Sequence, residues 1–347
     1  MSSPHKRTVD DCYSQLQERG HFAKAIERRK AKVQRLRQER NLPERSLIHG
    51  RDIDEVLATN HHSDAEVTPE SSVDMIFGSN ATCILSPDVT EGPYWVAGEL
   101  VREDVTEQET GVELMLDIQL INTNTCEPLP EEYLEIWSCN ATGVYGGVTA
   151  GGMGNGAAED TTNIDKTALR GIQLSDDDGV VSFKAIIPGH YIGRTHHIHV
   201  MTHTGAELLE NNTISGGAVT HVGQLYFDQD LVDEVETLEP YSSNDAAWTK
   251  NADDMIMAQG AETGDDPVVE YVFLGDDLAD GVFAWINIGV DPDNVMEPHP
   301  AVTLTEEGGV QNEDGGMPGG MPSGMPFPSG FPSGFPSGMP MPPRDRQ

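Results

Sequence analysis

The pattern of hydrophobic and polar positions divides the chain into a helical beginning, a β-rich body and a repetitive tail. Within residues 8–40, Phe22, Ile26, Val33 and Leu36 recur near the 3.6-residue period of a helix, and Arg, Lys, Glu and Gln fill the positions between them. This pattern predicts a helix that packs on the body of the protein or on a second subunit.

From about residue 80 the period changes to that of β-strands. In the stretch 114–121, Leu114, Leu116, Ile118 and Leu120 fall on one face. Turn residues bound each such stretch, and no long helical pattern intervenes, so a mainly β fold built as a sandwich or barrel is expected. The further predicted strands lie at 133–139, 180–187, 197–203, 223–227, 268–274 and 281–290.

Composition sets the expected domain organisation. Repeated Gly, Pro and Ser punctuated by Met or Phe cannot bury a core, so residues 308–347 are predicted to be a disordered tail. A basic helical extension (1–51) and a polar connector (52–79) precede a β-sandwich domain (80–307). Inside that domain, the long Gly-rich loop 146–163 is of a kind that often serves function.

Charge is unevenly distributed. The net charge is −37, yet residues 1–51 hold 13 Lys/Arg against 6 Asp/Glu, and the other residues hold 8 against 52. So acidic a body repels phosphate backbones, which argues against nucleic-acid binding. The sequence contains no run of about 18 apolar residues, so no membrane span is predicted. The apolar positions of the basic helix are too sparse to favour binding to anionic lipid.

Cysteines and glycosylation sequons bear on localisation. Cys12, Cys83, Cys126 and Cys139 form no C-x-x-C pair, and their even number fits two disulfides or reduced buried thiols equally well. Asn-x-Thr triplets at Asn80, Asn140 and Asn211 lean weakly toward secretion. The first residues lack the apolar stretch of a signal peptide, as a mature form with its leader removed would also do. A secreted glycoprotein is the expectation.

The segment 191–200, YIGRTHHIHV, holds the densest candidate chemistry. On a strand, His197 and His199 point to the same face while Ile198 and Val200 point into the packing, so two imidazoles can reach one metal ion. His196 falls on the opposite face and is interpreted as structural.

Two metal sites are compatible with these histidines. His203 shares their parity, and three imidazoles on zinc would indicate a hydrolase. Alternatively Tyr145 and Tyr191 complete the site, because tyrosinate oxygen together with imidazole suits ferric iron. Tyr145 follows a predicted strand, where Gly143 and Gly146 allow a tight turn.

Four ordered segments carry a family resemblance over about residues 80–300. They resemble the intradiol ring-cleavage dioxygenases, and in particular the secreted fungal branch of that family, which the basic N-terminal helix also resembles. The segments are TEGPYWV (90–96), LEIWSCNATGVYGG (134–147), GIQLSDDDGVVSFKAIIPGHYIGRTHHIHV (171–200) and HVGQLYFD (221–228).

The resemblance implies a β-sandwich that holds one non-haem Fe(III) per chain between its sheets. Position by position, it implies that Arg194 stabilises developing charge and that Gln224 lies beside the site and orients the substrate. Trp95 and Gly146 stand where many members have tyrosine and serine, so together with Tyr94 they are expected next to the substrate. The implied iron ligands are Tyr145, Tyr191, His197 and His199.

The resemblance also implies a reaction. A catechol-type aromatic diol displaces Tyr191, and O₂ is inserted between the hydroxyl-bearing carbons to give a cis,cis-muconate-type dicarboxylic acid. Two alternatives remain open from the sequence: the zinc hydrolase, and a secreted non-catalytic sandwich that binds carbohydrate or cell wall. A homodimer through the N-terminal helix is expected by analogy with the family.

Overall fold

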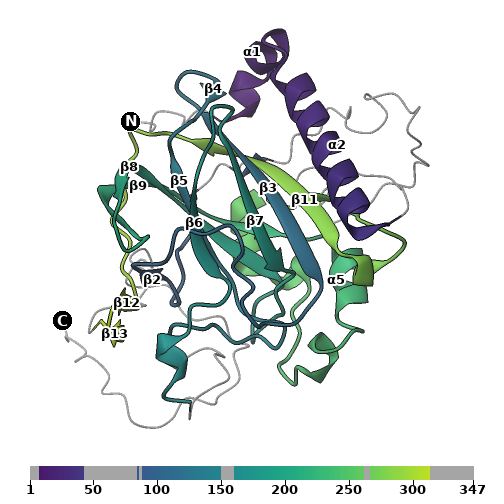
Figure 1. Cartoon of the computed structure of the whole chain (residues 1–347), viewed down its shortest axis with the longest axis vertical. Helices are drawn as coiled ribbons and strands as arrows, with labels where there is room; N and C mark the ends of the chain where they lie inside the picture. The colour runs from purple at the N-terminus through teal and green to yellow at the C-terminus, as the bar shows by residue number, and fades with distance from the viewer. Residues whose placement is uncertain (1–7, 43–83, 86–87, 150–159, 262–265, 313–347) are drawn as a thin grey trace, which may run out of the picture.

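The computed structural model describes residues 8–42, 84–85, 88–149, 160–261 and 266–312. Its body is two packed β-sheets (Figure 1). In the six-stranded sheet, β11 pairs in parallel with β3 and β1, β10 pairs antiparallel with β11, and β7 and β4 pair antiparallel with β3. Its strands are β1 (Ile84–Leu85), β3 (Glu113–Asn122), β4 (Glu127–Pro128), β7 (Val180–Ile186), β10 (Glu270–Phe273) and β11 (Val282–Val290).

The second sheet has four antiparallel strands in the order β6-β5-β8-β9. They are β5 (Tyr133–Trp137), β6 (Arg170–Leu174), β8 (His197–Leu208) and β9 (Ile214–Tyr226). A three-stranded sheet joins β2 (Val96–Ala97), β12 (Val302–Thr305) and β13 (Gly308–Gln311). The mainly β sandwich predicted from the sequence is confirmed.

The main hydrophobic core lies between the two large sheets. Every second residue of β3, from Leu114 to Leu120, enters it, and so do Ile198 and Val200 of β8. Helix α5 (Gln229–Val235) adds Leu231, Val232 and Val235. The period of two seen in the sequence is therefore the period of core contact.

The N-terminal helices cover the outer face of the six-stranded sheet (Figure 1). A 3₁₀ turn (Asp10–Cys12) and α1 (Tyr13–Glu18) lead into α2 (His21–Arg40), with the break at Gly20, whose φ is +68°. Val33 and Leu36 of α2 pack against aromatic side chains of β11. The helical prediction is confirmed, and the helix packs on the body of its own chain.

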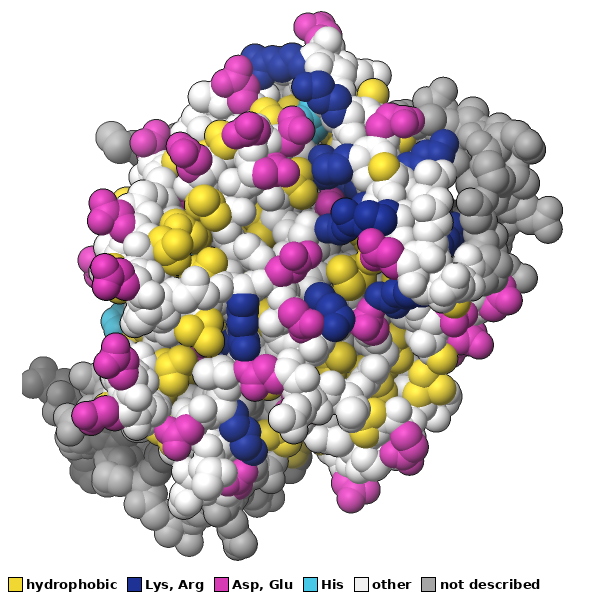
Figure 2. All heavy atoms as spheres, viewed as in Figure 1, with side chains coloured by type: hydrophobic (Ala, Val, Ile, Leu, Met, Phe, Trp, Pro, Cys, Tyr) yellow, Lys and Arg dark blue, Asp and Glu magenta, His cyan; other side chains and the backbone are white. Residues whose placement is uncertain are grey.

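Basic side chains of α2 form ion pairs and hydrogen bonds with that sheet. Arg28 Nη2 and Arg29 Nε lie 3.0 and 3.1 Å from Asp117 Oδ1, and Arg29 also donates to Asn287 at 3.0 Å. Figure 2 shows Lys and Arg side chains gathered along α2, with Asp and Glu scattered over the rest of this face. Among the described residues, no helix is both long and apolar enough to cross a membrane.

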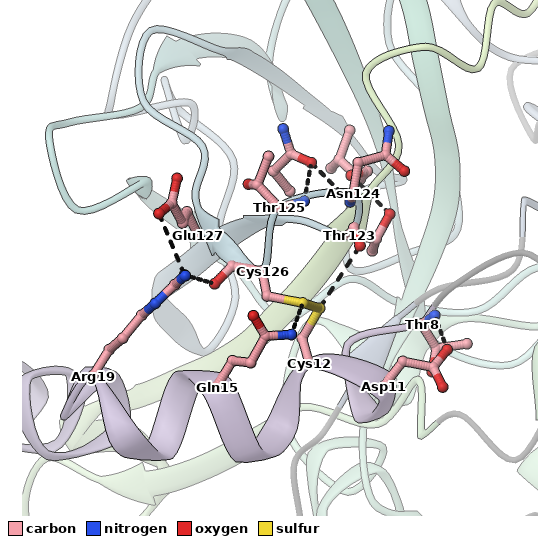
Figure 3. The surroundings of a disulfide bond; sticks show 12 residues. Thr8, Asp11, Cys12, Gln15, Arg19, Thr123, Asn124, Thr125, Cys126 and Glu127 are labelled. Carbon is pink, nitrogen blue, oxygen red and sulfur yellow. Dashed lines mark hydrogen bonds and ion pairs between the residues drawn. A yellow bond between two sulfur atoms is a disulfide. The ribbon is translucent and has the colours of Figure 1, made fainter.

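A disulfide joins Cys12 before α1 to Cys126 in the turn after β3 (Figure 3). Arg19, the residue after α1, donates to the Cys126 carbonyl at 2.6 Å, which ties the same two segments together. Cys139 is a buried free thiol, and Cys83 lies outside the described residues. The three described cysteines thus form one disulfide and one free thiol, where the sequence left both states open.

One predicted boundary can be compared with the described residues. β13 begins at Gly308 and pairs with β12, so the predicted start of the tail at residue 308 falls within a β-hairpin. The connector 52–79, most of the tail and the middle of the Gly-rich loop lie outside the described residues. The remaining elements are α6 (Met255–Ala261) and four 3₁₀ turns (Asn163–Asp165, Tyr241–Ser243, Asn251–Asp253 and Leu278–Asp280).

Candidate active site

Strand β8 separates its side chains as the sequence predicted. Ile198 and Val200 enter the core between the sheets, so His197 and His199 face the other way, and both histidines are buried. They therefore lie on the outer face of the four-stranded sheet, under the loops and the three-stranded sheet. The candidate ligands of β8 therefore do not lie between the two large sheets, where the resemblance implied the iron, because the inter-sheet side of β8 is occupied by aliphatic side chains.

Tyr145 reaches this face from a tight turn after β5. Asn140 organises the turn, since its side-chain oxygen accepts hydrogen bonds from the backbone N–H groups of Thr142 and Val144 at 3.1 and 3.0 Å. Gly143 has φ +80°, and a Cβ there would lie 2.1 Å from the His190 carbonyl oxygen. The prediction that Gly143 permits the turn is confirmed; Gly147, not Gly146, is the second glycine with positive φ.

Tyr191 and Arg194 sit at the two ends of a second tight turn. The backbone N–H of Arg194 donates to the Tyr191 carbonyl at 3.0 Å, and Gly193 between them has φ +82°. The turn folds both side chains toward His197: Tyr191 Oη and Arg194 Nη1 lie 3.5 and 3.4 Å from His197 Nε2. Residues three apart in sequence thus approach the same atom.

The structure brings all four predicted ligand side chains together. Tyr145 Oη lies 3.2 Å from His197 Nε2, and the rings of Tyr145 and Tyr191 meet edge to face with centroids 5.6 Å apart. The rings of His197 and His199 lie 4.9 Å apart. Two phenol oxygens and two imidazoles in one buried space form a donor set that suits a hard trivalent metal ion.

His199 is the clearest sign that a ligand belongs here. Its side chain is buried, stacks on Trp137 with centroids 4.7 Å apart, and has no hydrogen-bond partner at either nitrogen among the described residues. Gly92 closes over it, since a Cβ at that position would lie 3.1 Å from His199 Cε1. Buried polar atoms are normally paired, so an unpaired imidazole held in place by packing indicates a bound group.

Electrostatics keep the imidazoles neutral. Burial, with the nearby charge of Arg194 adding to it, lowers the pKa of His197 well below its usual range, and burial also lowers that of His199. The Nδ1–H of His197 donates to the Thr195 carbonyl at 2.7 Å, which leaves the Nε2 lone pair facing the tyrosines. Burial raises the pKa of Tyr145 and of Tyr191, so only a strong positive charge would stabilise their phenolates.

Arg194 is held by a network behind the cluster. Its Nη2 donates to Gln224 Oε1 at 2.5 Å and to Tyr226 Oη at 3.0 Å, and its Nε donates to Asp254 Oδ2 at 2.8 Å. Gln224 in turn donates to the Thr90 carbonyl at 3.2 Å. Burial opposes the charge of Arg194, but Tyr226, Tyr191 and Asp254 outweigh it and raise the pKa of its guanidinium.

The predicted substrate-adjacent residues occupy different places. Tyr94 stacks on Tyr145 with centroids 4.6 Å apart, so it lines the cluster. The indole N–H of Trp95 instead donates to Glu135 at 3.0 Å. A Cβ at Gly146 would face Lys166, 3.2 Å away, so a serine there would point toward that lysine.

The geometry overturns the zinc alternative. His203 Nε2 lies 2.7 Å from Glu135 Oε2, further along β8. In the part of the chain that the structure describes, the group of three His, Cys, Asp or Glu ligand atoms within 4.8 Å of one another is a different one, namely His190, His196 and Glu236. His197, His199 and His203 therefore do not form a three-histidine site.

Sequence reasoning missed Tyr226 and Asp254. Tyr226 lies directly opposite His197 in the β8–β9 pairing, as Gln224 lies opposite His199, so the period of two around Gln224 could have indicated it. Asp254 comes from a turn 60 residues beyond Arg194 and accepts from both Arg194 and the Thr195 backbone. No local pattern in the sequence marks it.

Fold and site together define a β-sandwich enzyme with a buried tyrosine–histidine centre beside an arginine. Comparisons with known proteins agree. A family model described as a dioxygenase matches residues 84–239, which include all four candidate ligands, Arg194 and Gln224. Over these residues the chain is similar to the family of intradiol ring-cleavage dioxygenases. Enzymes of this family in general use non-haem iron and cleave the rings of catechol-type compounds.

Three solved structures illustrate the relationship. An intradiol ring-cleavage dioxygenase from Tetranychus urticae is 26% identical, with 61% of this chain and 97% of that chain covered and a TM-score of 0.50. The dioxygenase domain of a fusion protein from Streptomyces sp. SirexAA-E is 24% identical, with 59% and 97% covered and a TM-score of 0.36. Catechol 1,2-dioxygenase from Acinetobacter sp. ADP1 is 18% identical, with 65% and 69% covered and a TM-score of 0.39. No curated protein matches the chain.

Proposed function

We propose that this protein is an Fe(III)-dependent intradiol dioxygenase that cleaves a catechol-type diol with O₂ to a cis,cis-muconate-type dicarboxylic acid. The observation that carries the proposal is the convergence of Tyr145, Tyr191, His197 and the unpartnered His199 on one buried space. The alternative of a non-catalytic binding module is set aside, because the matched family consists of enzymes and all four ligand positions are filled.

The residues fit one ferric ion per chain. Tyr145 and Tyr191 would supply two anionic oxygens, and His197 and His199 two neutral nitrogens, so the protein would offset two of the three positive charges. When bound, Fe(III) would draw electron density from a coordinated diol and make its ring reactive toward O₂. Burial of the donors, and the packing of Tyr94 and Trp137 on Tyr145 and His199, would exclude bulk water.

Tyr191 is the tyrosine best placed to exchange partners. Its Oη has Arg194 Nη1 at 3.5 Å, whereas Tyr145 lies deeper and is fully buried. A phenolate oxygen of Tyr191 can take a hydroxyl proton from the incoming diol and then remain hydrogen-bonded to Arg194. The contacts of Tyr145, which include its stacking on Tyr94, keep that residue in place.

Arg194 supplies the positive charge for the reaction. Its Nη1 edge faces Tyr191 and His197, while Gln224, Tyr226 and Asp254 hold its other edges. A guanidinium fixed in this way stabilises negative charge that develops on the substrate and needs no reorganisation to do so. Gln224 acts through Arg194, because both ends of its amide are already bonded within the protein.

The substrate class follows from the charges at the site. Arg194 is the cation nearest the cluster, and Asp254 already pairs with it at 2.8 Å. A diol without a strongly charged substituent therefore fits best. We also propose that the enzyme is extracellular, because the Cys12–Cys126 disulfide is typical of oxidising compartments. Plant-derived catechols would be consistent substrates for an enzyme in that location. The resemblance to the secreted fungal branch and the homodimer through the N-terminal helix stay predictions.

Oxygen uptake with a panel of catechols tests the proposal. Iron-loaded protein should consume one O₂ per diol with catechol or an uncharged alkyl or aryl catechol, and a carboxylated catechol should react more slowly. Tyr145→Phe should abolish uptake, while Tyr271→Phe, a buried tyrosine of the main core, should not. Uptake by none of the catechols, with iron bound, would reject the assignment.

A further inference from the structure

A second buried group of ionisable side chains stands next to the candidate ligands and has no role in the reaction described above. His190 Nδ1 lies 2.7 Å from Glu236 Oε1, and His196 Nε2 lies 2.8 Å from the same oxygen. The two imidazole rings are buried with centroids 5.7 Å apart, and both lie near Trp248. One carboxylate oxygen thus bridges two histidines.

The positions of the two histidines in the sequence show which part of the site this bridge supports. His190 immediately precedes Tyr191, and His196 immediately precedes His197. Between them the chain makes the tight turn closed by the hydrogen bond from Arg194 N to Tyr191 O. Glu236 therefore spans the base of the turn that carries Tyr191 and Arg194.

Glu236 itself lies at the end of a helix that packs into the core. It is the C-cap of α5, whose Leu231, Val232 and Val235 are buried in the core between the sheets. The His190 ring is fixed from its other side, where Nε2 lies 3.1 Å from the Ala246 carbonyl oxygen. The bridge thus links the turn to the part of the molecule with the most extensive packing.

A metal ion shared by the three side chains is the competing explanation. Two nitrogen or oxygen ligands of a tetrahedral zinc ion lie roughly 3.3 Å apart, given bonds of about 2.0–2.1 Å. The separations of 2.7 and 2.8 Å are shorter and match proton-mediated contacts. The contact with His196 is equally short but is not aligned as a hydrogen bond. We therefore assign the group as a bridge in which Glu236 is hydrogen-bonded to His190 and in close polar contact with His196.

We propose that Glu236 is a positioning residue that, through His190 and His196, fixes the separation of Tyr191 and His197 in the ferric site. The inference rests on the proposed function. It predicts that losing the bridge loosens the turn while leaving all four ligands in the chain. Partners of metal ligands are typically worth about 10–100-fold in metal affinity or activity.

The test compares Glu236→Ala and Glu236→Gln with Glu132→Gln as the matched control. Glu132 is also buried and accepts a hydrogen bond from Thr204 at 2.8 Å, at the far end of β8. Iron affinity, the visible tyrosinate-to-iron absorption band, kcat and KM are measured for each. The account expects about 10–100-fold weaker iron binding and a shifted band in Glu236→Ala, a lower kcat with little change in KM, and a smaller effect in Glu236→Gln.

A metal-free measurement separates this inference from the proposed function. Trypsin can cut after Arg194, within the turn, and the metal-free Glu236→Ala chain should be cut there faster than wild type or Glu132→Gln. Failure of wild type to bind iron would reject the proposed function, and the cleavage rates would still decide the bridge. If Glu236→Ala keeps the wild-type cleavage rate and the wild-type absorption band, the proposed positioning role of Glu236 is overturned. A second metal equivalent in wild type that is lost with Glu236 would also overturn it.

Discussion

Each large sheet carries a buried polar cluster on its outer face, and the two clusters differ in how completely they are paired. Under α2, Asp117 accepts from Arg28 and Arg29, and Arg29 also reaches Asn287. On the four-stranded sheet, neither nitrogen of His199 has a hydrogen-bond partner in the part of the chain that the structure describes. In the Asp117 cluster the buried carboxylate is paired with two guanidinium groups of the protein itself, whereas the His199 cluster needs a group from outside.

The comparison shows how to distinguish stabilising from functional polar groups inside a protein. A paired cluster holds elements together, and removing one partner leaves a buried charge unpaired. A cluster whose nitrogen atoms lack hydrogen-bond partners contributes little to the stability of the fold until a ligand binds. Substitutions in the two clusters should therefore act on opposite properties of the protein.

The largest effect is expected from His199→Ala. Oxygen uptake with catechol should fall more than about 100-fold, because a direct ligand should matter more than the outer partners that are worth 10–100-fold. The metal-free chain should lose less unfolding free energy than Asp117→Ala does, since His199 has only packing contacts to lose. Uptake assays and urea unfolding measure the two quantities, and an active His199→Ala enzyme would refute the site.

The opposite outcome is expected from Asp117→Ala. The change leaves two buried arginine contacts without their anion and should lower the free energy of unfolding by about 3–5 kcal/mol. Oxygen uptake per folded molecule should stay at the wild-type rate, because α2 lies on the other sheet. Loss of activity at full folding would show that the two faces are coupled.

Glu99 provides an intermediate case. Its carboxylate lies 3.7 Å from Arg170 Nε, but burial outweighs that attraction and raises its pKa from 4.5 to about 8. Above pH 4.5 the unfolded chain releases this proton while the folded chain keeps it, so stability falls as pH rises toward 8. Relative to Glu99→Gln, the wild type should lose about 2–3 kcal/mol between pH 5 and pH 7.

Urea unfolding of the metal-free proteins at the two pH values checks this sign. Equal pH dependence in wild type and Glu99→Gln would mean that Arg170 keeps the carboxylate ionised. The Glu99–Arg170 pair would then belong with the paired Asp117 cluster.

The smallest effect is expected from Tyr226→Phe. The hydroxyl receives a hydrogen bond from Arg194 and donates one to Gln224, so its loss should cost about 1 kcal/mol of charge stabilisation. That corresponds to roughly a fivefold lower kcat with KM nearly unchanged. Steady-state kinetics beside Tyr271→Phe provide the measurement, and a raised KM with unchanged kcat would place Tyr226 in substrate binding.

The sequence was informative where local periodicity determines the structure. The alternation around Ile198 and Val200 placed His197 and His199 on one face of a strand. Both the strand and the alternation of its side chains between the two faces are confirmed. The ligand tyrosines came from the family resemblance and from glycine-rich turns, and the turn at Gly143 is confirmed. The expectation of a site between the two large sheets came from the family resemblance, and the packing of Ile198 and Val200 shows that the candidate ligands of β8 lie on the other face.

Other parts of the site depend on tertiary contacts that no local pattern contains. Asp254 and Glu236 reach the turn at Arg194 from 60 and 42 residues further along the chain. The pairing of Cys12 with Cys126 joins segments 114 residues apart. Such groups were found only once the fold had brought them together.

The central claim is tested most directly by the identity of the product formed from catechol under labelled O₂. Iron-loaded protein should yield cis,cis-muconic acid, with the ring opened between the hydroxyl-bearing carbons and oxygen from O₂ in the product. Nuclear magnetic resonance identifies it as a dicarboxylic acid with no aldehyde proton. An aldehyde product, which reports cleavage beside the two hydroxyl-bearing carbons, or the absence of labelled product would contradict the account.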